Sequence, residues 1–318
     1  MIIARAPMFV NLMGDASYSQ DAISVAIDKY VYAVINPTPL VDHVSARYSV
    51  TESVSSTKEL KNERVRETLL KFGIKGNIEI GSFAPIPMEV GFKSFLSFTT
   101  ALVAGLRSSL DSNVESKILA KEVLEIESRA LNPNHTIQGI YSATHGGINV
   151  FTFGKKTYQA RQLYLDFHER LKFEEAISVY FVKLKGKFKK KYPVKKGARR
   201  LASKATKALV AKFINALTEG NIKECGTLLY ESWILEKKIG VNSCPDIIDR
   251  VYDAAISDGA FGGKYIGDIN SGCLILLGNC KYPSLERLLN STRNIQHSKF
   301  DISLVQSGVK TIFKLRHE

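Results

Sequence analysis

The feature that most constrains the fold is a strand, a loop and a helix in direct succession over residues 76–106. The segment "GNIEIGSF" alternates apolar and polar residues, which is the period of a half-buried strand. A loop around Gly91 follows, and apolar residues then recur at helical spacing from Ser94 onwards. Free backbone N–H groups at the start of a helix favour a bound anion. The succession therefore predicts a mixed fold of helices and strands with a candidate phosphate loop.

The residue types in this loop are unusual for a phosphate site. Such loops usually carry two or three glycines and small hydroxyl residues, because phosphate oxygens approach the backbone closely. Here Phe92, Phe95 and Leu96 take such places. The position indicates a phosphate loop, whereas the composition indicates that the loop has changed.

Length and composition limit the class of protein. A chain of 318 residues with 45% hydrophobic content suggests one large domain or two ordinary ones. It contains no run of eighteen apolar residues and no signal-peptide pattern, which predicts a cytoplasmic protein without a membrane span. The four cysteines lack C-x-x-C spacing and are expected to be reduced and structural.

The net charge of +13 belongs to one segment. No acidic residue occurs between Glu175 and Glu219, whereas thirteen lysines and arginines occur over residues 183–212. Glycines and a proline within residues 183–200 predict a protruding basic loop. This loop is either a solvated surface segment or a patch for a polyanion such as RNA, anionic lipid or a phosphorylated ligand.

The rest of the chain alternates between strand and helix patterns. Strands are expected over residues 22–35, 45–50, 146–153, 272–279 and 309–315. Helices are expected over residues 113–131, 201–217, 225–239 and 245–259. Glu127 falls on the apolar stripe of the first of these helices. Because an unpaired buried carboxylate is costly, it lies either at the boundary of the core or in a site.

Several segments, taken together, carry a family resemblance. They are "RAPMFVNLMGD", "AIDKYVYA", "IEIGSFAPIP", "SFTTAL", "HGGINVF", "LLYESW" and "DGAFGGKYIG". In this order they resemble the GHMP family of small-molecule kinases, and most of all its sugar kinases for D-glycero-D-manno-heptose 7-phosphate. The resemblance implies an α+β fold, with a ribosomal S5 domain 2-like N-terminal domain over residues 1–160. A ferredoxin-like C-terminal domain follows over residues 161–318, and ATP and sugar would meet between the two.

The resemblance also implies roles for individual residues. Nucleotide contacts fall in the second and third family motifs, at Gly91, Lys93, Ser94, Ser97, Gly267 and Gly272. Substrate contacts fall at Asp15, Tyr18, Arg200 and Lys264, and Glu127 takes the position of a metal ligand.

Four departures from the family pattern concern the chemistry. Gly139 replaces the aspartate beside the attacking hydroxyl, and losing a positioned base typically costs ~10²–10⁴ in rate. Phe95 replaces a serine that helps to hold Mg²⁺. Phe9 replaces an arginine and Tyr18 a sugar-binding aspartate. Asp15 either compensates for that carboxylate or forms a turn. The fourth departure is in the third motif, where residues 268–271 are larger than the small residues of the family.

Three functions remain open on this reading. The departures favour a sugar kinase homologue with a degenerate active site, a weakly active or inactive pseudokinase that keeps the fold with or without a ligand cleft. The alternative is an active, divergent sugar kinase that uses ATP and Mg²⁺ and binds nucleotide and sugar phosphate. A further alternative is a polyanion-binding scaffold. If the cleft is otherwise intact, Gly139→Asp with Phe95→Ser is expected to raise turnover.

Overall fold

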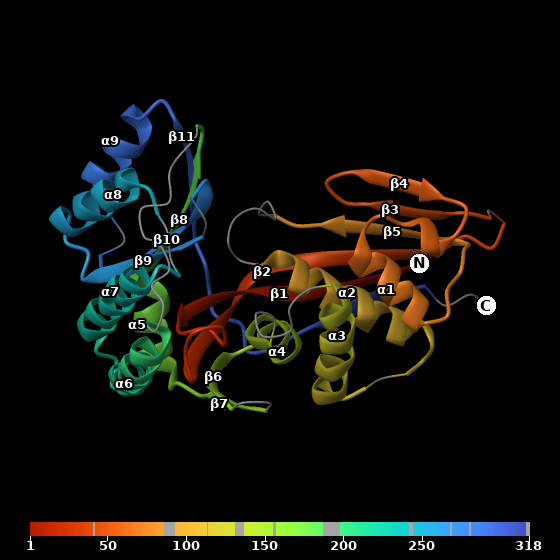
Figure 1. Ribbon diagram of the computed structural model, residues 1–318, viewed down its shortest axis with the longest axis horizontal. Helices are drawn as coiled ribbons and strands as arrows, with labels where there is room; N and C mark the ends of the chain where they lie inside the picture. Colours follow the sequence, from red (N-terminus) through yellow and green to blue (C-terminus); the bar gives the residue numbers. More distant parts are fainter. Residues whose placement is uncertain are drawn as a thin grey trace.

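The computed structural model describes residues 1–40, 42–85, 93–112, 114–130, 137–154, 157–186, 198–241, 244–267, 269–279 and 281–315. It contains two sheets at the two ends of an elongated molecule, each covered by helices (Figure 1). The expected α+β fold class is confirmed.

The larger sheet runs in the order β12-β1-β2-β5-β3-β4, with β6 and β7 branching from β2. Its strands are β1 (Ile2–Met13), β2 (Asp21–Pro37), β3 (Val44–Arg47), β4 (Thr51–Val54), β5 (Ile78–Phe83), β6 (Ile148–Phe153), β7 (Tyr158–Leu163) and β12 (Lys310–Lys314). All pairs are antiparallel except β3 with β5. The long β1–β2 pair carries the main core and reaches towards the second sheet.

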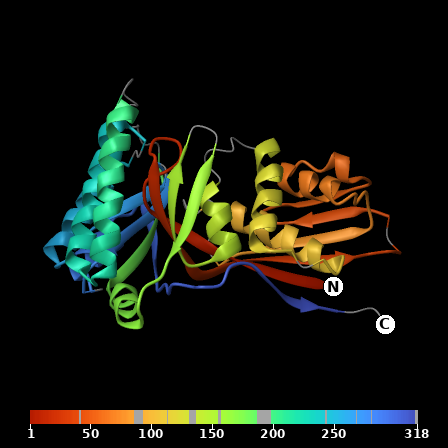
Figure 2. The ribbon, with the colours of Figure 1, turned by 90° about the horizontal axis from the view of Figure 1, so that it is seen from below.

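Helices cover one face of the larger sheet (Figure 2). They are α1 (Glu63–Lys71), which follows the short 3-10 helix η1 (Thr57–Glu59), and α2 (Ser94–Ser109), α3 (Ser116–Ala130) and α4 (Ile137–His145). Most residues of α2 are buried against β1 and β2. The helix begins after Lys93, whose backbone has the left-handed φ of 45°. This placement brings the first turn of α2 to the edge of the region between the sheets.

The smaller sheet runs in the order β11-β8-β10-β9. Its strands are β8 (Ile177–Leu184), β9 (Gly262–Gly267), β10 (Ser271–Leu277) and β11 (Ile295–Phe300). The surrounding helices are α5 (Phe167–Ala176), α6 (Ala198–Thr218), α7 (Ile222–Ile239), α8 (Asp246–Ser257) and α9 (Pro283–Ser291). The aromatic side chains Tyr180, Trp233 and Tyr265 form part of a second core between this sheet and its helices.

Two strands, β7 and β12, do not fit a division of the chain into two consecutive domains at residue 160. Strand β12 pairs with β1, so the last strand returns to the sheet of the first. Strand β7 spans residue 160 and pairs with β6. The division into residues 1–160 and 161–318 remains a sequence-based proposal. Residues 187–197 of the predicted basic loop lie outside the described residues, so the polyanion hypothesis remains a prediction.

Most of the expected elements are present with shifted ends. The pattern at residues 22–35 is strand β2, that at 113–131 is helix α3, and that at 245–259 is helix α8. Strand β1 was not expected from alternation, because residues 6–10 are buried on both faces and a two-residue burial period is limited to residues 2–6. Within the described part of the chain, no helix has the length and apolarity needed to cross a membrane.

Candidate functional site

A pocket of about 240 Å³ lies where the β1–β2 connection meets α7 and β9. Its lining comes from β1, the following turn, the start of α2, helix α7 and strand β9. The residues are Phe9, Val10, Asn11, Gly14, Asp15, Ser17, Tyr18, Lys93, Glu236, Val241, Lys264, Ile266 and Gly267. The pocket therefore brings together residues of the first, second and third family motifs.

Glu236 is the centre of the polar network in this pocket. Its Oε1 atom accepts hydrogen bonds from the Tyr18 hydroxyl and from Lys264 Nζ, both at 2.7 Å. Ser232 Oγ donates to the same atom at 3.4 Å. The side chains of Glu236 and Lys264 are only 6% and 4% exposed. This buried ion pair ties α7 to β9 and to the turn after β1.

The phenol of Tyr18 is held in its neutral form. Burial raises its pKa well above the usual value, and the negative charge of Glu236 and its hydrogen bond act in the same direction. The charge of Asp15 adds to this effect. Tyr18 is therefore a hydrogen-bond donor in the pocket and is unsuited to accept a proton.

Asp15 and Lys93 form a second ion pair on the pocket wall. Lys93 Nζ lies 3.4 Å from Asp15 Oδ2, and the two side chains are 31% and 16% exposed. Asp15 Oδ1 also accepts from the backbone N–H of Ser17 at 2.9 Å, which is the turn-forming role that the sequence left open. The pocket thus presents two cations, two carboxylates and a phenol to a small polar ligand.

Next to the pocket, Gly139 packs against two apolar side chains. A Cβ atom at residue 139 would lie 2.4 Å from both Phe9 Cζ and Leu96 Cδ1. Phe9 is 2% exposed and Leu96 is fully buried, and both belong to one apolar cluster with Ile140. The side chains of Phe9 and Leu96 therefore fill the space that a side chain at residue 139 would need.

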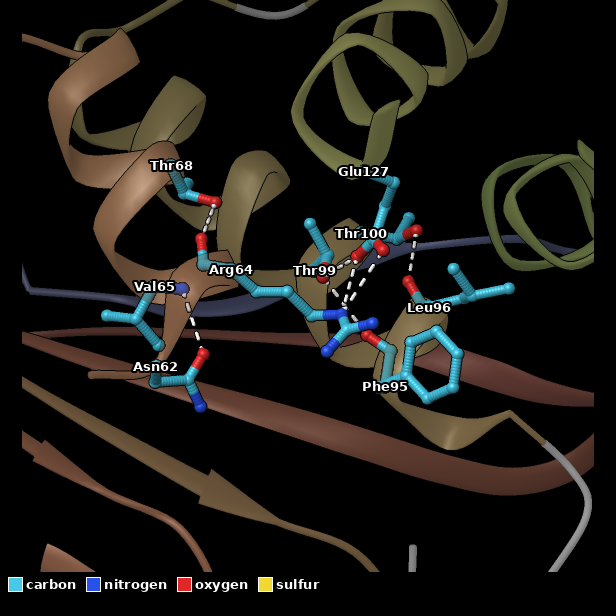
Figure 3. A network of polar contacts seen from close by, with 9 residues as sticks. All are labelled: Asn62, Arg64, Val65, Thr68, Phe95, Leu96, Thr99, Thr100 and Glu127. Atoms are coloured by element: carbon cyan, nitrogen blue, oxygen red, sulfur yellow. Dashed lines mark hydrogen bonds and ion pairs between the residues drawn. The ribbon is translucent and has the colours of Figure 1, made fainter. Parts of the chain in front are cut away.

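The carboxylate of Glu127 is fully buried and extends from α3 towards Arg64 of α1 and Thr99 of α2 (Figure 3). Arg64 Nε donates to Oε1 at 3.0 Å and to Oε2 at 3.1 Å, and Thr99 Oγ1 donates to Oε1 at 2.6 Å. Burial raises the pKa of Glu127, while the Arg64 charge and the Thr99 hydrogen bond lower it in part. Glu127 is thus held inside the protein by specific partners and is not at the boundary of the core.

The fold has counterparts among known proteins, although no protein-family model matches the sequence. A D-glycero-alpha-D-manno-heptose 7-phosphate kinase from Campylobacter jejuni is 24% identical over 243 residues, 74% of this chain and 70% of that protein. The structure of a D-glycero-D-manno-heptose 1-phosphate kinase from Bacteriodes thetaiotaomicron matches with a TM-score of 0.75 at 16% identity, covering 100% of both chains. Mevalonate kinase from Methanococcus jannaschii matches with a TM-score of 0.69 at 20% identity, covering 95% of this chain and 98% of that one. The chain has the GHMP kinase fold. The resemblance seen in the sequence motifs is thereby confirmed.

The sequence resemblance predicts the base position at Gly139 and polar positions at Phe9 and Leu96. The expectation that Gly139→Asp with Phe95→Ser raises turnover stays a prediction, and the packing around residue 139 argues against it. The new aspartate would overlap the Phe9 ring and Leu96, neither of which that pair of changes removes. Phe95→Ser would also take away the ring on which the Arg64 guanidinium rests, 4.1 Å from its centre.

The Mg²⁺ that the GHMP kinase fold implies does not fit the surroundings of Glu127. Magnesium requires oxygen ligands in octahedral geometry and usually retains several waters. Both oxygens of this carboxylate already accept from a guanidinium, and Phe95 supplies no oxygen. Among the described residues, no group of three histidine, cysteine or acidic side chains could hold a metal ion. The role of Glu127 as a metal ligand stays a prediction, and the geometry supports a different role.

The remaining predicted nucleotide contacts are distributed unevenly. Lys93 and Gly267 line the pocket, whereas Ser97, Ser94 and Gly272 do not. Ser94 is 1% exposed. Gly272 faces Gly267 across the β9–β10 pair, where a Cβ on Gly267 would lie 2.4 Å from Gly272 Cα, so this pair permits close strand approach. Gly91 and the side chain of Arg200 lie outside the described residues.

Glu236 is a pocket residue that the motif comparison missed. A signal was present, because Glu236 follows Leu229 and Trp233 on the buried stripe of α7, as Glu127 does on α3. An acid on an apolar helical stripe therefore marked both Glu127 and Glu236.

Ser97 has a structural partner that can be tested. Its hydroxyl donates to the Pro7 carbonyl at 2.8 Å and is fully buried. We expect Ser97→Ala to lower the free energy of unfolding by about 1 kcal/mol, because a buried hydrogen bond is lost. Urea denaturation measures this change. Nucleotide binding should be unaltered, and a selective loss of binding with unchanged stability would instead support the predicted nucleotide contact.

Proposed function

We propose that this chain is a GHMP sugar-kinase homologue that binds a sugar phosphate and does not transfer phosphate at an ordinary enzymatic rate. The observation that carries the proposal is the packing of Phe9 and Leu96 into the space beside Gly139. Gly139 has no side chain that could take a proton from a hydroxyl, and the apolar side chains around it cannot act as a base either.

The polar pocket supports the binding half of the proposal. Lys93 and Lys264 bring positive charge, and Asp15 and the Tyr18 hydroxyl can pair with sugar hydroxyls. Similarity to a heptose 7-phosphate kinase makes a sugar phosphate the first ligand class to test. Nucleotide is the second, because Lys93 and Gly267 fall in the motifs that contact it in the resembling kinases.

The turnover experiment is a direct one. We expect purified protein with ATP, Mg²⁺ and heptose 7-phosphate to turn over at ~10⁻³–10⁻¹ s⁻¹ or less, since enzymes typically reach about 10 s⁻¹ and a lost base costs ~10²–10⁴. The Campylobacter jejuni relative in the same assay is the positive control. A rate near ~10 s⁻¹ on any sugar phosphate would contradict the proposal and favour an active kinase with altered substrate.

Calorimetry with the same sugar phosphate tests binding separately from turnover. Lys93→Ala should weaken binding roughly tenfold to a hundredfold, the cost of one hydrogen bond to a charged group. Lys58→Ala is the matched control, because Lys58 is exposed and does not line the pocket. Equal losses in the two variants would show that the pocket is not where the ligand binds.

A further inference from the structure

Arg64 lies between a carboxylate and an aromatic ring (Figure 3). Its Nε atom donates to both oxygens of Glu127, and its Cζ atom lies 4.1 Å from the centre of the Phe95 ring. The Arg64 side chain is 23% exposed, whereas the Glu127 side chain is not exposed at all. A cation is thus already bound to the one carboxylate that the motif comparison assigns to a metal.

Three helices hold this arrangement in place. Asn62 Oδ1 accepts from the Val65 N–H at 3.2 Å and so caps α1, and Thr68 donates to the Arg64 carbonyl one turn later. Helix α2 supplies Phe95 and Thr99, and helix α3 supplies Glu127. Because the partners lie on packed helices, the guanidinium has a fixed position relative to the carboxylate.

The charges of the two groups explain why they occur together. A buried carboxylate without a cation is strongly unfavourable, so Glu127 needs a positive partner inside the protein. Arginine suits this role because its planar guanidinium is always charged and stacks on aromatic faces. The phenylalanine at residue 95 provides such a face where a serine would have provided a metal ligand. Arg64 and Phe95 together therefore take the place of a hydrated metal ion beside Glu127.

We propose that Arg64 is the resident cation of this site and that Glu127 binds no divalent cation. The guanidinium neutralises the carboxylate in place of Mg²⁺, and it also rests on the Phe95 ring. This inference concerns the same region as the proposed function, but a different experimental result would contradict it. Divalent cation binding at Glu127 would overturn it without any turnover, whereas turnover would overturn the proposed function whatever binds at Glu127.

The experiment uses Mn²⁺ as the probe, with electron paramagnetic resonance for binding and the melting temperature for stability. Wild-type protein should bind no Mn²⁺ at this site and should melt at the same temperature in Mn²⁺ and in EDTA. Arg64→Ser leaves Glu127 without its cation, so the melting temperature should fall by many degrees. Mn²⁺ should restore part of the loss, because it can enter the vacated space.

Two further variants complete the test. Arg64→Ser with Glu127→Gln removes both charges, so it should melt above Arg64→Ser and should not respond to Mn²⁺. If the single variant does not fold, recovery of folded protein in the double variant carries the same conclusion. A double variant as unstable as the single one, or wild-type Mn²⁺ binding that Glu127→Gln abolishes, would overturn the proposal.

Discussion

Gly139→Asp is expected to lower the free energy of unfolding by about 3 kcal/mol or more, and to produce no phosphoryl transfer. The Cβ atom of the new aspartate would lie 2.4 Å from both Phe9 Cζ and Leu96 Cδ1. The rest of its side chain must therefore enter a space that these two residues already occupy. Overpacking of a core costs typically 1–3 kcal/mol, and burying a carboxylate among apolar groups adds to that cost. Urea denaturation of the variant and the kinase assay described above measure the two outcomes.

Glycine-to-alanine variants separate packing from helix propensity. Gly139 lies within helix α4, where alanine would ordinarily stabilise by ~1 kcal/mol, so a destabilised Gly139→Ala would identify the overlap with Phe9 as the cause. Gly76→Ala, in the bend before β5, is a control for packing alone, because its new Cβ would meet only Asp42 Oδ1, at 3.5 Å. Adding Phe9→Ala to Gly139→Asp should recover part of the stability, since the effects of substitutions at contacting residues on the free energy of unfolding are not additive. A Gly139→Asp variant as stable as wild type would refute this account of the base position.

Lys264→Met is expected to lower the free energy of unfolding by about 3–5 kcal/mol. It removes the cation from a pair in which both side chains are almost fully buried, and so leaves the charge of Glu236 without its lysine. Adding Glu236→Gln should recover a large part of the loss, because the uncompensated charge is then gone. Thermal and urea denaturation of the two variants measure the difference.

The control for that pair is Lys29→Met, which breaks the ion pair with Asp28. Those side chains are 23% and 35% exposed, so the expected change is below about 1 kcal/mol. If Lys264→Met is no worse than Lys29→Met, the Glu236 network does not link α7 to β9 energetically, and the pocket wall is less rigid than the geometry indicates.

Much of the fold follows from local patterns in the chain. The helical stripes of α3 and α8 predict these helices, because each helix has one buried and one exposed face. In β2 the two-residue period of the sequence coincides with alternating burial over residues 31–35, whereas residues 21–27 are buried on both faces. Motif order was sufficient to identify the GHMP kinase fold and to select Asp15, Lys93 and Lys264, which do lie together in the pocket. Strand β1 was not predicted, because burial on both faces over residues 6–10 interrupts the periodic signal.

Only the tertiary structure decided how the altered positions relate to one another. The sequence marks Phe9, Leu96 and Gly139 as three separate departures, and contact across β1, α2 and α4 makes them a single packed unit. It marks Glu127 as an acid on an apolar stripe, but its partner Arg64 lies 63 residues away on another helix. Local periodicity depends on the geometry of a single helix or strand, so it can be read directly from the sequence. Charge compensation and steric filling depend on which elements pack together, so the identity of a buried carboxylate's cation is known only once the chain has folded.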